Sequence, residues 1–250
     1  MHNLLDQDLL RVIHEAHAAG RTVAVVTVLE PSGDHSKLIV EEGVAPRPPG
    51  PIPGWFEAAN EAARVALASR RTSDLTESTL PGGTFTIAVE VLRPRTSLVL
   101  FGAGHVGQAL ALVAALVGYS VTVIDDREQF LTRDRFPDPS ISLLHRAFDQ
   151  VAGSLEISTS TAVVIVTRGH QYDEQCLKDT IDSPAAYIGM IGSKRRVIAV
   201  FRRLTALGVD AEKLGRVHAP IGLSIGAVSP QEIAVAILAE IIQTLNSRGA

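Results

Sequence analysis

From Ser97 onward, short apolar runs alternate with longer stretches that suit amphipathic helices. Four runs have the length of buried strands, at residues 98–101, 120–124, 162–166 and 186–191. The first is followed by an apolar helical stretch at 106–117, and helix-compatible stretches follow the later ones. This alternation is typical of a parallel sheet with crossover helices. The sequence therefore predicts an α/β fold, with a Rossmann-like parallel-sheet domain at residues 95–250.

The first 94 residues have a different pattern. We expect a helix at 6–19, a strand at 22–29, a helix at 56–68 and a strand at 84–91. Five prolines between residues 46 and 53 indicate a loop, because proline fixes φ and lacks an N–H group. Residues 1–94 are therefore predicted to form a small α+β domain that precedes the parallel-sheet domain.

Composition excludes several classes of protein. The net charge of −4 gives no long-range attraction to nucleic acid or to acidic membranes. Asp6 and Asp8 stand where a signal peptide would be basic, and the longest apolar run, 109–117, is shorter than the ~20 residues that span a bilayer. The single cysteine, Cys176, rules out a disulfide within the chain and is expected to be buried. We expect a cytoplasmic protein with neither nucleic acid nor membrane partners.

A glycine motif follows the first strand of the predicted parallel sheet. Gly102, Gly104 and Gly107 enclose Ala103, His105 and Val106 in a G-x-G-x-x-G string that opens a helix. In that context, the glycines allow a tight turn, close approach of a pyrophosphate and close helix packing, while the helix N-terminus attracts the anion. The motif predicts a dinucleotide-type site that includes His105 and Val106. The alternative is a glycine-rich turn that only serves packing.

Acidic residues follow the second predicted strand of this domain. Asp125 lies 23 residues beyond Gly102, where a carboxylate can accept hydrogen bonds from a ribose diol. Asp126 could take this role instead. An acidic residue here favours NAD over NADP, although the neighbouring Arg127 weakens that preference. We assign Asp125, Asp126 and Arg127 to the site.

A polar segment follows the strand expected at 162–166. Histidine side chains ordinarily titrate near neutral pH, so His170 is a candidate acid or base, with Asp173 to orient it and Arg168 to hold an anion. In the competing interpretation, His170 and Asp173 only cap the next helix. Similarly, Gly192, Ser193, Lys194 and Arg195 follow the strand at 186–191 and could bind a phosphate, or could be a solvated helix face.

A glycine-punctuated loop at 220–227 precedes a predicted helix start. Ser229 is expected as the N-cap, Pro230 as the first helical residue and Glu232 as the residue that reaches back. No H-E-x-x-H or P-loop string occurs, and the sequence predicts no metal site.

Four strings together resemble one family. They are LVLFGAGHVGQALALVAALVGYSVTVIDDR, TRGHQYD, YIGMIGSKRR and PIGLSIGAVSPQEIAVAILAEI. Their order and spacing are similar to those of the XdhC/CoxI family, accessory proteins of xanthine dehydrogenase and related molybdenum hydroxylases, over residues 97–245. The resemblance implies a Rossmann-like C-terminal domain that binds molybdenum cofactor (molybdopterin), promotes its sulfuration and delivers it to the apo-enzyme. It also implies a cysteine desulfurase as a further partner.

The N-terminal part departs from that family. Members usually carry S-x-P-R-x-x-G and then G-G-G-C-V-E. The corresponding segments here are residues 31–34 and 54–58, and neither contains a cysteine. The departure concerns sulfur transfer more than ligand binding.

Three functions therefore compete. The first is a maturation protein for a molybdenum hydroxylase, which binds its ligand rather than catalysing turnover. The second is an NAD-dependent oxidoreductase in which His170 transfers a proton and Arg168 orients a carboxylate substrate. The third is a degenerate paralogue that binds nucleotide and regulates a partner. A homodimer is the expectation from the frequency of such assemblies.

Overall fold

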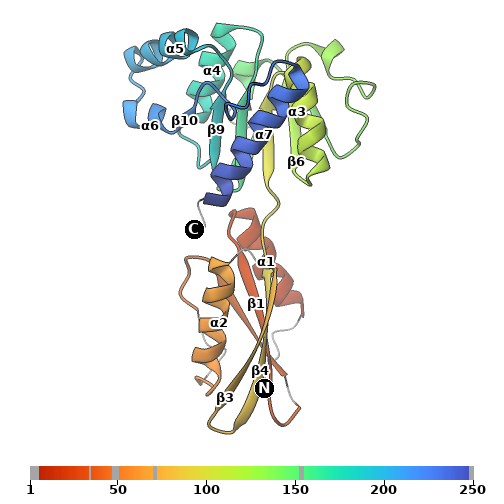
Figure 1. Cartoon of the computed structure of the whole chain (residues 1–250), viewed down its shortest axis with the longest axis vertical. Helices are drawn as coiled ribbons and strands as arrows, with labels where there is room; N and C mark the ends of the chain where they lie inside the picture. Colours follow the sequence, from red (N-terminus) through yellow and green to blue (C-terminus); the bar gives the residue numbers. More distant parts are fainter. Residues whose placement is uncertain (1–5, 34, 47–50, 70–71, 152–154, 248–250) are drawn as a thin grey trace. The chain divides into compact units, whose positions relative to one another are not determined.

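The structure is a computed structural model that describes residues 6–33, 35–46, 51–69, 72–151 and 155–247, without the side chains of residues 6–8 and 170. The chain divides between Pro94 and Arg95 into two compact units (Figure 1). We call them the N-terminal unit and the C-terminal unit. No helix in the described part of the chain is long and apolar enough to cross a membrane.

The N-terminal unit is an antiparallel sheet with two helices. Its elements are α1 (Asp6–Ala18), β1 (Val23–Leu29), β2 (His35–Glu41), α2 (Phe56–Ala68), β3 (Ser73–Leu80) and β4 (Gly83–Leu92). The strand order is β2-β1-β4-β3. Helix α2 packs Ala59 and Ala63 on one face of the sheet, against residues such as Val26 and Ile87. Helix α1 covers Val23 and Val25 on the other face.

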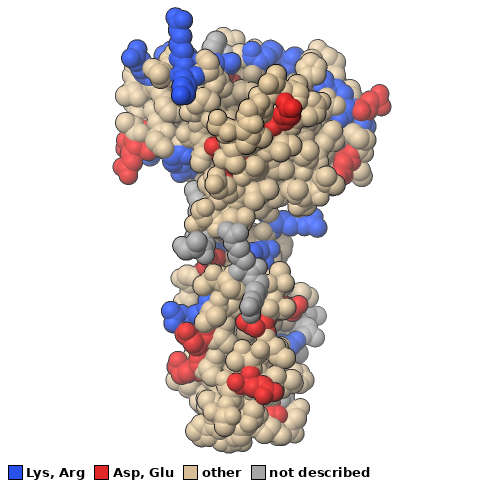
Figure 2. Space-filling view, viewed as in Figure 1, with Lys and Arg blue, Asp and Glu red and all other residues tan. Residues whose placement is uncertain are grey.

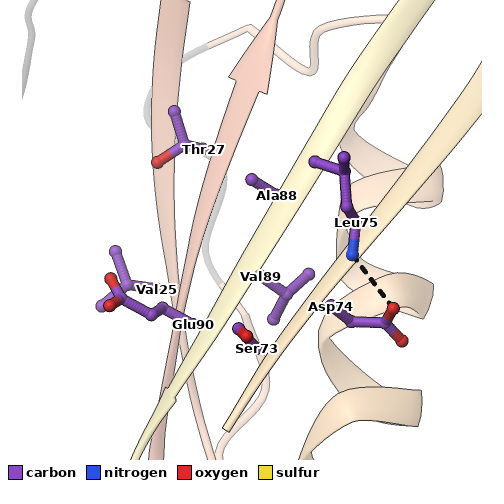
Figure 3. Close-up of a pocket in the computed structure, with 8 residues that line it drawn as sticks. All are labelled: Val25, Thr27, Ser73, Asp74, Leu75, Ala88, Val89 and Glu90. Carbon is purple, nitrogen blue, oxygen red and sulfur yellow. Dashed lines mark hydrogen bonds between the residues drawn. The ribbon is translucent and has the colours of Figure 1, made fainter.

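The sheet of the N-terminal unit carries a groove of about 530 Å³ (Figure 3). It is lined by Val25, Thr27, Ser73, Asp74, Leu75, Ala88, Val89 and Glu90. Leu75 lies at this groove with 68% of its surface exposed.

The C-terminal unit is a six-stranded parallel sheet with helices on both faces. Its main elements are β5 (Ser97–Phe101), α3 (His105–Leu116), β6 (Ser120–Asp125), β7 (Ser142–His145), β8 (Thr161–Ile165), α4 (His170–Thr180), β9 (Tyr187–Met190), α5 (Lys194–Ala206), α6 (Ala211–Gly215), β10 (Val217–His218) and α7 (Pro230–Ser247). Short 3₁₀ turns lie at Glu128–Phe130 and Phe148–Gln150. The order β10-β9-β8-β5-β6-β7 confirms the predicted Rossmann-like fold.

Alternate side chains of the parallel strands fill two separate cores. Leu98 and Leu100 of β5 face α3 and α7, whereas Val99 and Phe101 face α4 and α5. Strands buried on both faces have continuous apolar sequences, which explains the runs seen in the sequence. The strand order reverses between β5 and β8, because the chain runs outward from β5 to β7 and then returns to pair β8 with β5. Ligands of open α/β sheets bind beyond the carboxyl ends of the strands at such a point.

The predicted elements agree closely with those observed. Helix α2 has the expected bounds, and β8 and β9 lie within one residue of the expected strands. Strands β2, β3, β7 and β10 were not predicted from the sequence pattern. Of the proline-rich loop, residues 47–50 lie outside the described part, while 42–46 and 51–55 contain neither helix nor strand.

Candidate functional site

Two glycines of the motif are required by packing. Gly102 has φ of +112°, and a Cβ on it would lie 2.5 Å from the carbonyl oxygen of Val166, just after β8. A Cβ on Gly107 would lie 1.9 Å from the carbonyl oxygen of Gly102. The turn after β5 therefore packs directly against both the end of β8 and the first turn of α3. No larger side chain fits either position without a backbone shift.

Gly104 differs from these two glycines. It is the N-cap of α3, with φ of −65° and ψ of −172°, which other residues also adopt. Among the described residues, a Cβ built on it has no neighbouring atom within 4 Å apart from its chain neighbours and its own helix. Neither backbone conformation nor packing within the chain requires glycine here. The position leaves the first backbone N–H groups of α3 open to close approach, which suits a phosphate.

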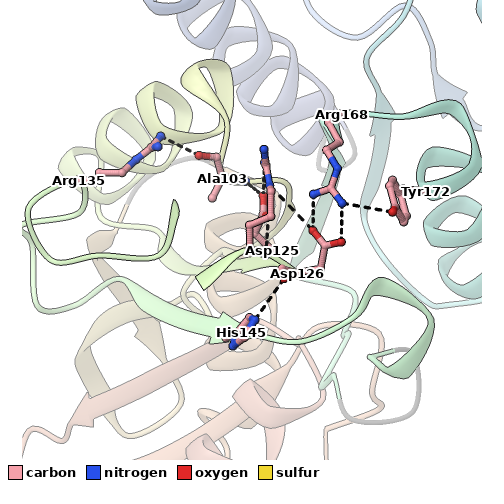
Figure 4. A network of polar contacts seen from close by, with 8 residues as sticks. Ala103, Asp125, Asp126, Arg135, His145, Arg168 and Tyr172 are labelled. Carbon is pink, nitrogen blue, oxygen red and sulfur yellow. Dashed lines mark hydrogen bonds and ion pairs between the residues drawn. The ribbon is translucent and has the colours of Figure 1, made fainter. Parts of the chain in front are cut away.

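Ala103, which precedes Gly104, is held through both its backbone N–H and its carbonyl group. The Ala103 N–H donates to Asp125 Oδ2 at 2.7 Å, and Arg135 Nη2 donates to the Ala103 carbonyl oxygen at 2.8 Å (Figure 4). Arg135 also donates to Gln108 Oε1 at 2.9 Å, and Gln108 Nε2 donates back to the Arg135 carbonyl oxygen. The orientation of the turn is therefore fixed without a ligand.

The carboxylate of Asp125 holds this turn through a hydrogen bond from the backbone. The residue is fully buried, and Arg127 donates to its Oδ1 through Nε at 2.8 Å and through the backbone N–H at 3.0 Å. Arg127 Nη2 donates to Oδ2 at 2.9 Å, beside the bond from Ala103. Burial raises the pKa of Asp125, but the hydrogen bonds from Arg127 and Ala103 outweigh it and hold the pKa below its ordinary value. The predicted bond from Asp125 to a ribose diol would have to displace these partners.

Asp126 makes a different contact. Its two carboxylate oxygens accept from Nη1 and Nη2 of Arg168 at 2.6 and 2.8 Å (Figure 4). Arg168 also donates to the Tyr172 hydroxyl at 3.2 Å, and its guanidinium lies 4.9 Å from the centre of that ring. The hydrogen bond to Asp126 raises the pKa of Arg168. Side chains from the ends of β6 and β8 thus meet beside the glycine turn.

The segment after β8 also contains a buried carboxylate. Asp173 is fully buried, accepts from Thr167 Oγ1 at 2.5 Å and pairs with Arg196 of α5. The side chain of His170, the first residue of α4, lies outside the described part of the structure. The catalytic roles assigned to His170 and Asp173 stay predictions. The observed contacts of Asp173 connect α4 to α5.

The other predicted site residues lie along the same edge of the sheet. His105 is exposed in the first turn of α3, while Val106 packs on the core. After β9, Gly192 precedes Ser193, the N-cap of α5, whose hydroxyl accepts from the Arg196 N–H at 3.3 Å. Lys194 and Arg195 are exposed at the start of α5. Figure 2 shows basic side chains on the part of the surface where α5 lies in Figure 1.

The loop after β10 is anchored by Glu240 of α7. Glu240 Oε2 accepts from the Tyr187 hydroxyl at 2.5 Å and from the Gly222 N–H at 2.8 Å. Burial, together with the bond to Glu240, raises the pKa of Tyr187. Ile225 and Val228 of this loop are exposed.

Cys176 is fully buried on α4, as predicted. Burial raises the pKa of its thiol, and the nearby Asp173 and Asp179 raise it further. Among the described residues, no group of three or more histidine, cysteine, aspartate or glutamate side chains is arranged to hold a metal ion.

Sequence reasoning missed the roles of Arg135 and Tyr172. Arg135 donates a hydrogen bond to the Ala103 carbonyl oxygen, 32 positions earlier in the chain, so no local sequence pattern marks it. Tyr172 lies four positions after Arg168. Arg168 precedes Gly169, the N-cap of α4, so the i, i+4 rule for helices does not cover this pair and gave no signal for it.

Comparison with known proteins gives a consistent result. Residues 98–241 match the model of the XdhC Rossmann domain. The chain is 40% identical over 167 residues to "Uncharacterized protein YqeB" of Escherichia coli (strain K12). This match covers 66% of this chain and 30% of that protein. It is 33% identical over 156 residues to a probable xanthine dehydrogenase subunit of Bacillus subtilis (strain 168), covering 62% and 45%.

A third relative is the "Molybdenum cofactor insertion chaperone PaoD" of Escherichia coli (strain K12), 26% identical over 149 residues, or 60% of this chain and 40% of that protein. The matches therefore span less than half of these three proteins. Among solved structures, a xanthine dehydrogenase from Bacillus halodurans superposes with a TM-score of 0.70 at 22% identity, covering 98% of this chain and 69% of that one. At that identity, the likeness demonstrates a shared fold.

Proposed function

The chain belongs to the XdhC Rossmann domain family, and from that membership we propose that it is a maturation protein for a molybdenum hydroxylase. In this proposal, it binds the anionic end of the molybdenum cofactor at the carboxyl edge of its parallel sheet and delivers the cofactor to the apo-enzyme. The names of two relatives, one a xanthine dehydrogenase component and the other a molybdenum cofactor insertion chaperone, support a maturation role.

The observation that carries the binding proposal is the open position at Gly104. Packing accounts for Gly102 and Gly107, whereas a Cβ built on Gly104 would meet no atom of the described residues within 4 Å outside its chain neighbours and its own helix. A phosphate of the cofactor would fit beside it, held by the N–H groups of the first turn of α3 and by Arg168. The positive end of the helix dipole favours the same anion.

The chain's own residues would hold, orient and release the ligand. Asp125 and Arg135 hold the turn in one orientation before binding, so little conformational entropy is lost when the ligand arrives. The bound cofactor supplies the molybdenum centre that the hydroxylase uses. We assign no turnover reaction to this chain.

Sulfuration requires a donor other than this chain. Cys176 is its single cysteine, and the thiol is buried with a raised pKa. A thiol in that state is a poor nucleophile and cannot readily carry sulfur. We therefore propose that a cysteine desulfurase supplies the sulfur while this protein holds the cofactor.

The NAD-dependent oxidoreductase receives less support. Its ribose would need a free carboxylate at the end of β6. Asp125 already accepts four hydrogen bonds there, and Asp126 is paired with Arg168. Binding of the NAD ribose through either carboxylate would require one of these two arrangements to change.

Mass spectrometry of the small molecules that copurify with the protein separates these functions. A molybdopterin species is the expected result, and NAD alone would favour the oxidoreductase or the regulatory paralogue. In cells, deletion of the gene should lower xanthine or carbon monoxide dehydrogenase activity while leaving the amount of hydroxylase polypeptide unchanged. Full activity with a normal molybdenum content would contradict the proposal.

A further inference from the structure

The pair formed by Asp126 and Arg168 spans the central strand of the parallel sheet. Asp126 directly follows β6, and Arg168 lies three residues after the end of β8. These strands are not neighbours, because β5 lies between them. Two side chains that start beyond the ends of β6 and β8 can only meet across the end of β5. The glycine turn that begins α3 starts at that end of β5.

This ion pair is accessible to solvent. The side chains of Asp126 and Arg168 are 21% and 38% exposed, and their contact is bidentate. By contrast, Asp125 in the neighbouring pair is buried and also binds the backbone. An exposed pair contributes little to stability and can exchange one anion for another. The contact between Asp126 and Arg168 can therefore open without disturbing the fold.

Tyr172 keeps Arg168 in place if the carboxylate of Asp126 moves away from it. Its hydroxyl accepts from Arg168 Nη2, and its ring lies beneath the guanidinium. Neither contact depends on Asp126. Arg168 would then present its two terminal nitrogens to an incoming anion, in the geometry that suits a phosphate.

We propose that Asp126 is an internal competitor for the ligand's anionic group, and that Arg168 is the residue that selects ligands by charge. In the free protein, Asp126 occupies the guanidinium. A phosphate-bearing ligand displaces the carboxylate and takes its place, whereas an uncharged analogue cannot. This inference rests on the proposed function, because it requires the anion to lie at the turn that contains Gly104.

Isothermal titration with inorganic pyrophosphate at low salt tests the inference. Asp126→Asn keeps the size of the side chain and removes its charge, so it should tighten pyrophosphate binding about threefold to tenfold. Arg168→Gln should weaken binding, and the double variant should lose the gain from Asp126→Asn. Such non-additivity is the mark of two residues that act through one contact.

Glu174→Gln is the matched control. Glu174 has the same side-chain exposure as Asp126, 21%, and pairs with Arg203 of α5 in an exposed contact. The change alters net charge by the same amount in the same unit, so a general charge effect would appear in both variants. We expect its pyrophosphate affinity to equal that of the wild type.

The outcomes distinguish this inference from the proposed function. Equal affinities of Asp126→Asn and wild type, or an equal gain in Glu174→Gln, would overturn the inference. If Gly104→Val still weakens binding in that case, the site at the turn stands. Absence of pyrophosphate binding by both the wild type and Asp126→Asn would overturn the inference and the anion site together.

Discussion

The backbone N–H of Ala103 donates a hydrogen bond of 2.7 Å to the buried carboxylate of Asp125. This bond ties the turn after β5 to the end of β6, two segments that are 22 positions apart in the chain. The remaining carboxylate bonds come from Arg127. The acidic residue at the position expected for ligand recognition thus also organises the glycine turn.

Asp125→Asn should therefore destabilise the C-terminal unit by about 3 kcal/mol. The change leaves Arg127 without its charged partner, and it replaces one accepting carboxylate oxygen with an NH2 group that cannot accept a hydrogen bond. The two units can be followed separately during urea unfolding. The single tryptophan, Trp55, is buried in the N-terminal unit, and all three tyrosines lie in the C-terminal unit. We expect a lower midpoint in tyrosine near-UV circular dichroism and an unchanged midpoint in tryptophan fluorescence. A shift in the tryptophan signal alone would contradict this account.

The cost of Asp125→Asn should depend on pH. Hydrogen bonds hold the folded-state pKa of Asp125 below its unfolded value of about 3.9. The stabilisation is therefore fully present above the unfolded pKa and is lost as the pH falls through the folded pKa. Urea midpoints of wild type and variant should converge below about pH 4. A gap at about pH 3 as large as that at about pH 7 would show that the charge of Asp125 is not what stabilises the turn.

Sequence patterns predicted most of the fold because burial leaves a periodic signal. The apolar runs of β5 and β8 reflect strands covered on both faces. Strand β3 left no such signal, since SDLTESTL is largely exposed and is held by pairing with β4 across the turn at Pro81 and Gly82. The two-residue β10 is too short for any periodicity.

For the candidate site, the sequence located the loops but not the contacts within them. The G-x-G-x-x-G spacing placed Gly102, Gly104 and Gly107 correctly at the start of a helix. It could not separate Gly104 from the other two, because that distinction depends on which atoms lie nearby in space. Similarly, two adjacent aspartates look alike in sequence, yet Asp125 faces the backbone and Asp126 faces Arg168.

Gly104→Val and Gly107→Ala form a test of that distinction. Gly104→Val should still fold, with a loss of at most about 1 kcal/mol from the less favourable N-cap, because its backbone conformation is ordinary and its Cβ would meet no nearby atom of the described residues. Its pyrophosphate affinity should fall at least tenfold. Gly107→Ala should destabilise the C-terminal unit by about 3 kcal/mol or more, because its Cβ would overlap the Gly102 carbonyl. Equal affinities of Gly104→Val and wild type would place the ligand elsewhere.

Cys176 should not react with Ellman's reagent in the folded protein at about pH 8. The thiol is buried, and burial raises its pKa, so access and thiolate formation are both suppressed. One thiol per chain should react in denaturant. Cys176→Ala should leave hydroxylase maturation in cells unchanged, apart from a loss of about 1 kcal/mol in stability from the small cavity. Loss of maturation with a normally folded variant would indicate that this thiol does carry sulfur.

The start of α7 provides a test of local stability near the candidate site. Ser229 Oγ accepts from the Glu232 N–H at 3.2 Å, and the Glu232 carboxylate accepts from the N–H groups of Ser229 and Val228 at 2.8 Å each. These bonds confirm the predicted capping box and lower the pKa of Glu232. Ser229→Ala should cost about 1 kcal/mol, measured by the tyrosine signal in urea.

Ser247→Ala is the control for that change, since Ser247 lies at the other end of α7 and donates to the Gln243 carbonyl oxygen rather than capping the helix start. It should leave the urea midpoint within error of the wild type.

Helix α7 packs along α3, as the cores of the C-terminal unit show. Fraying at Ser229 should therefore also increase hydrogen exchange in the adjoining loop at 223–228, whereas exchange in β5 should stay slow because that strand is buried on both faces. Faster exchange throughout β5 in Ser229→Ala would mean that the cap stabilises the whole unit rather than the helix start.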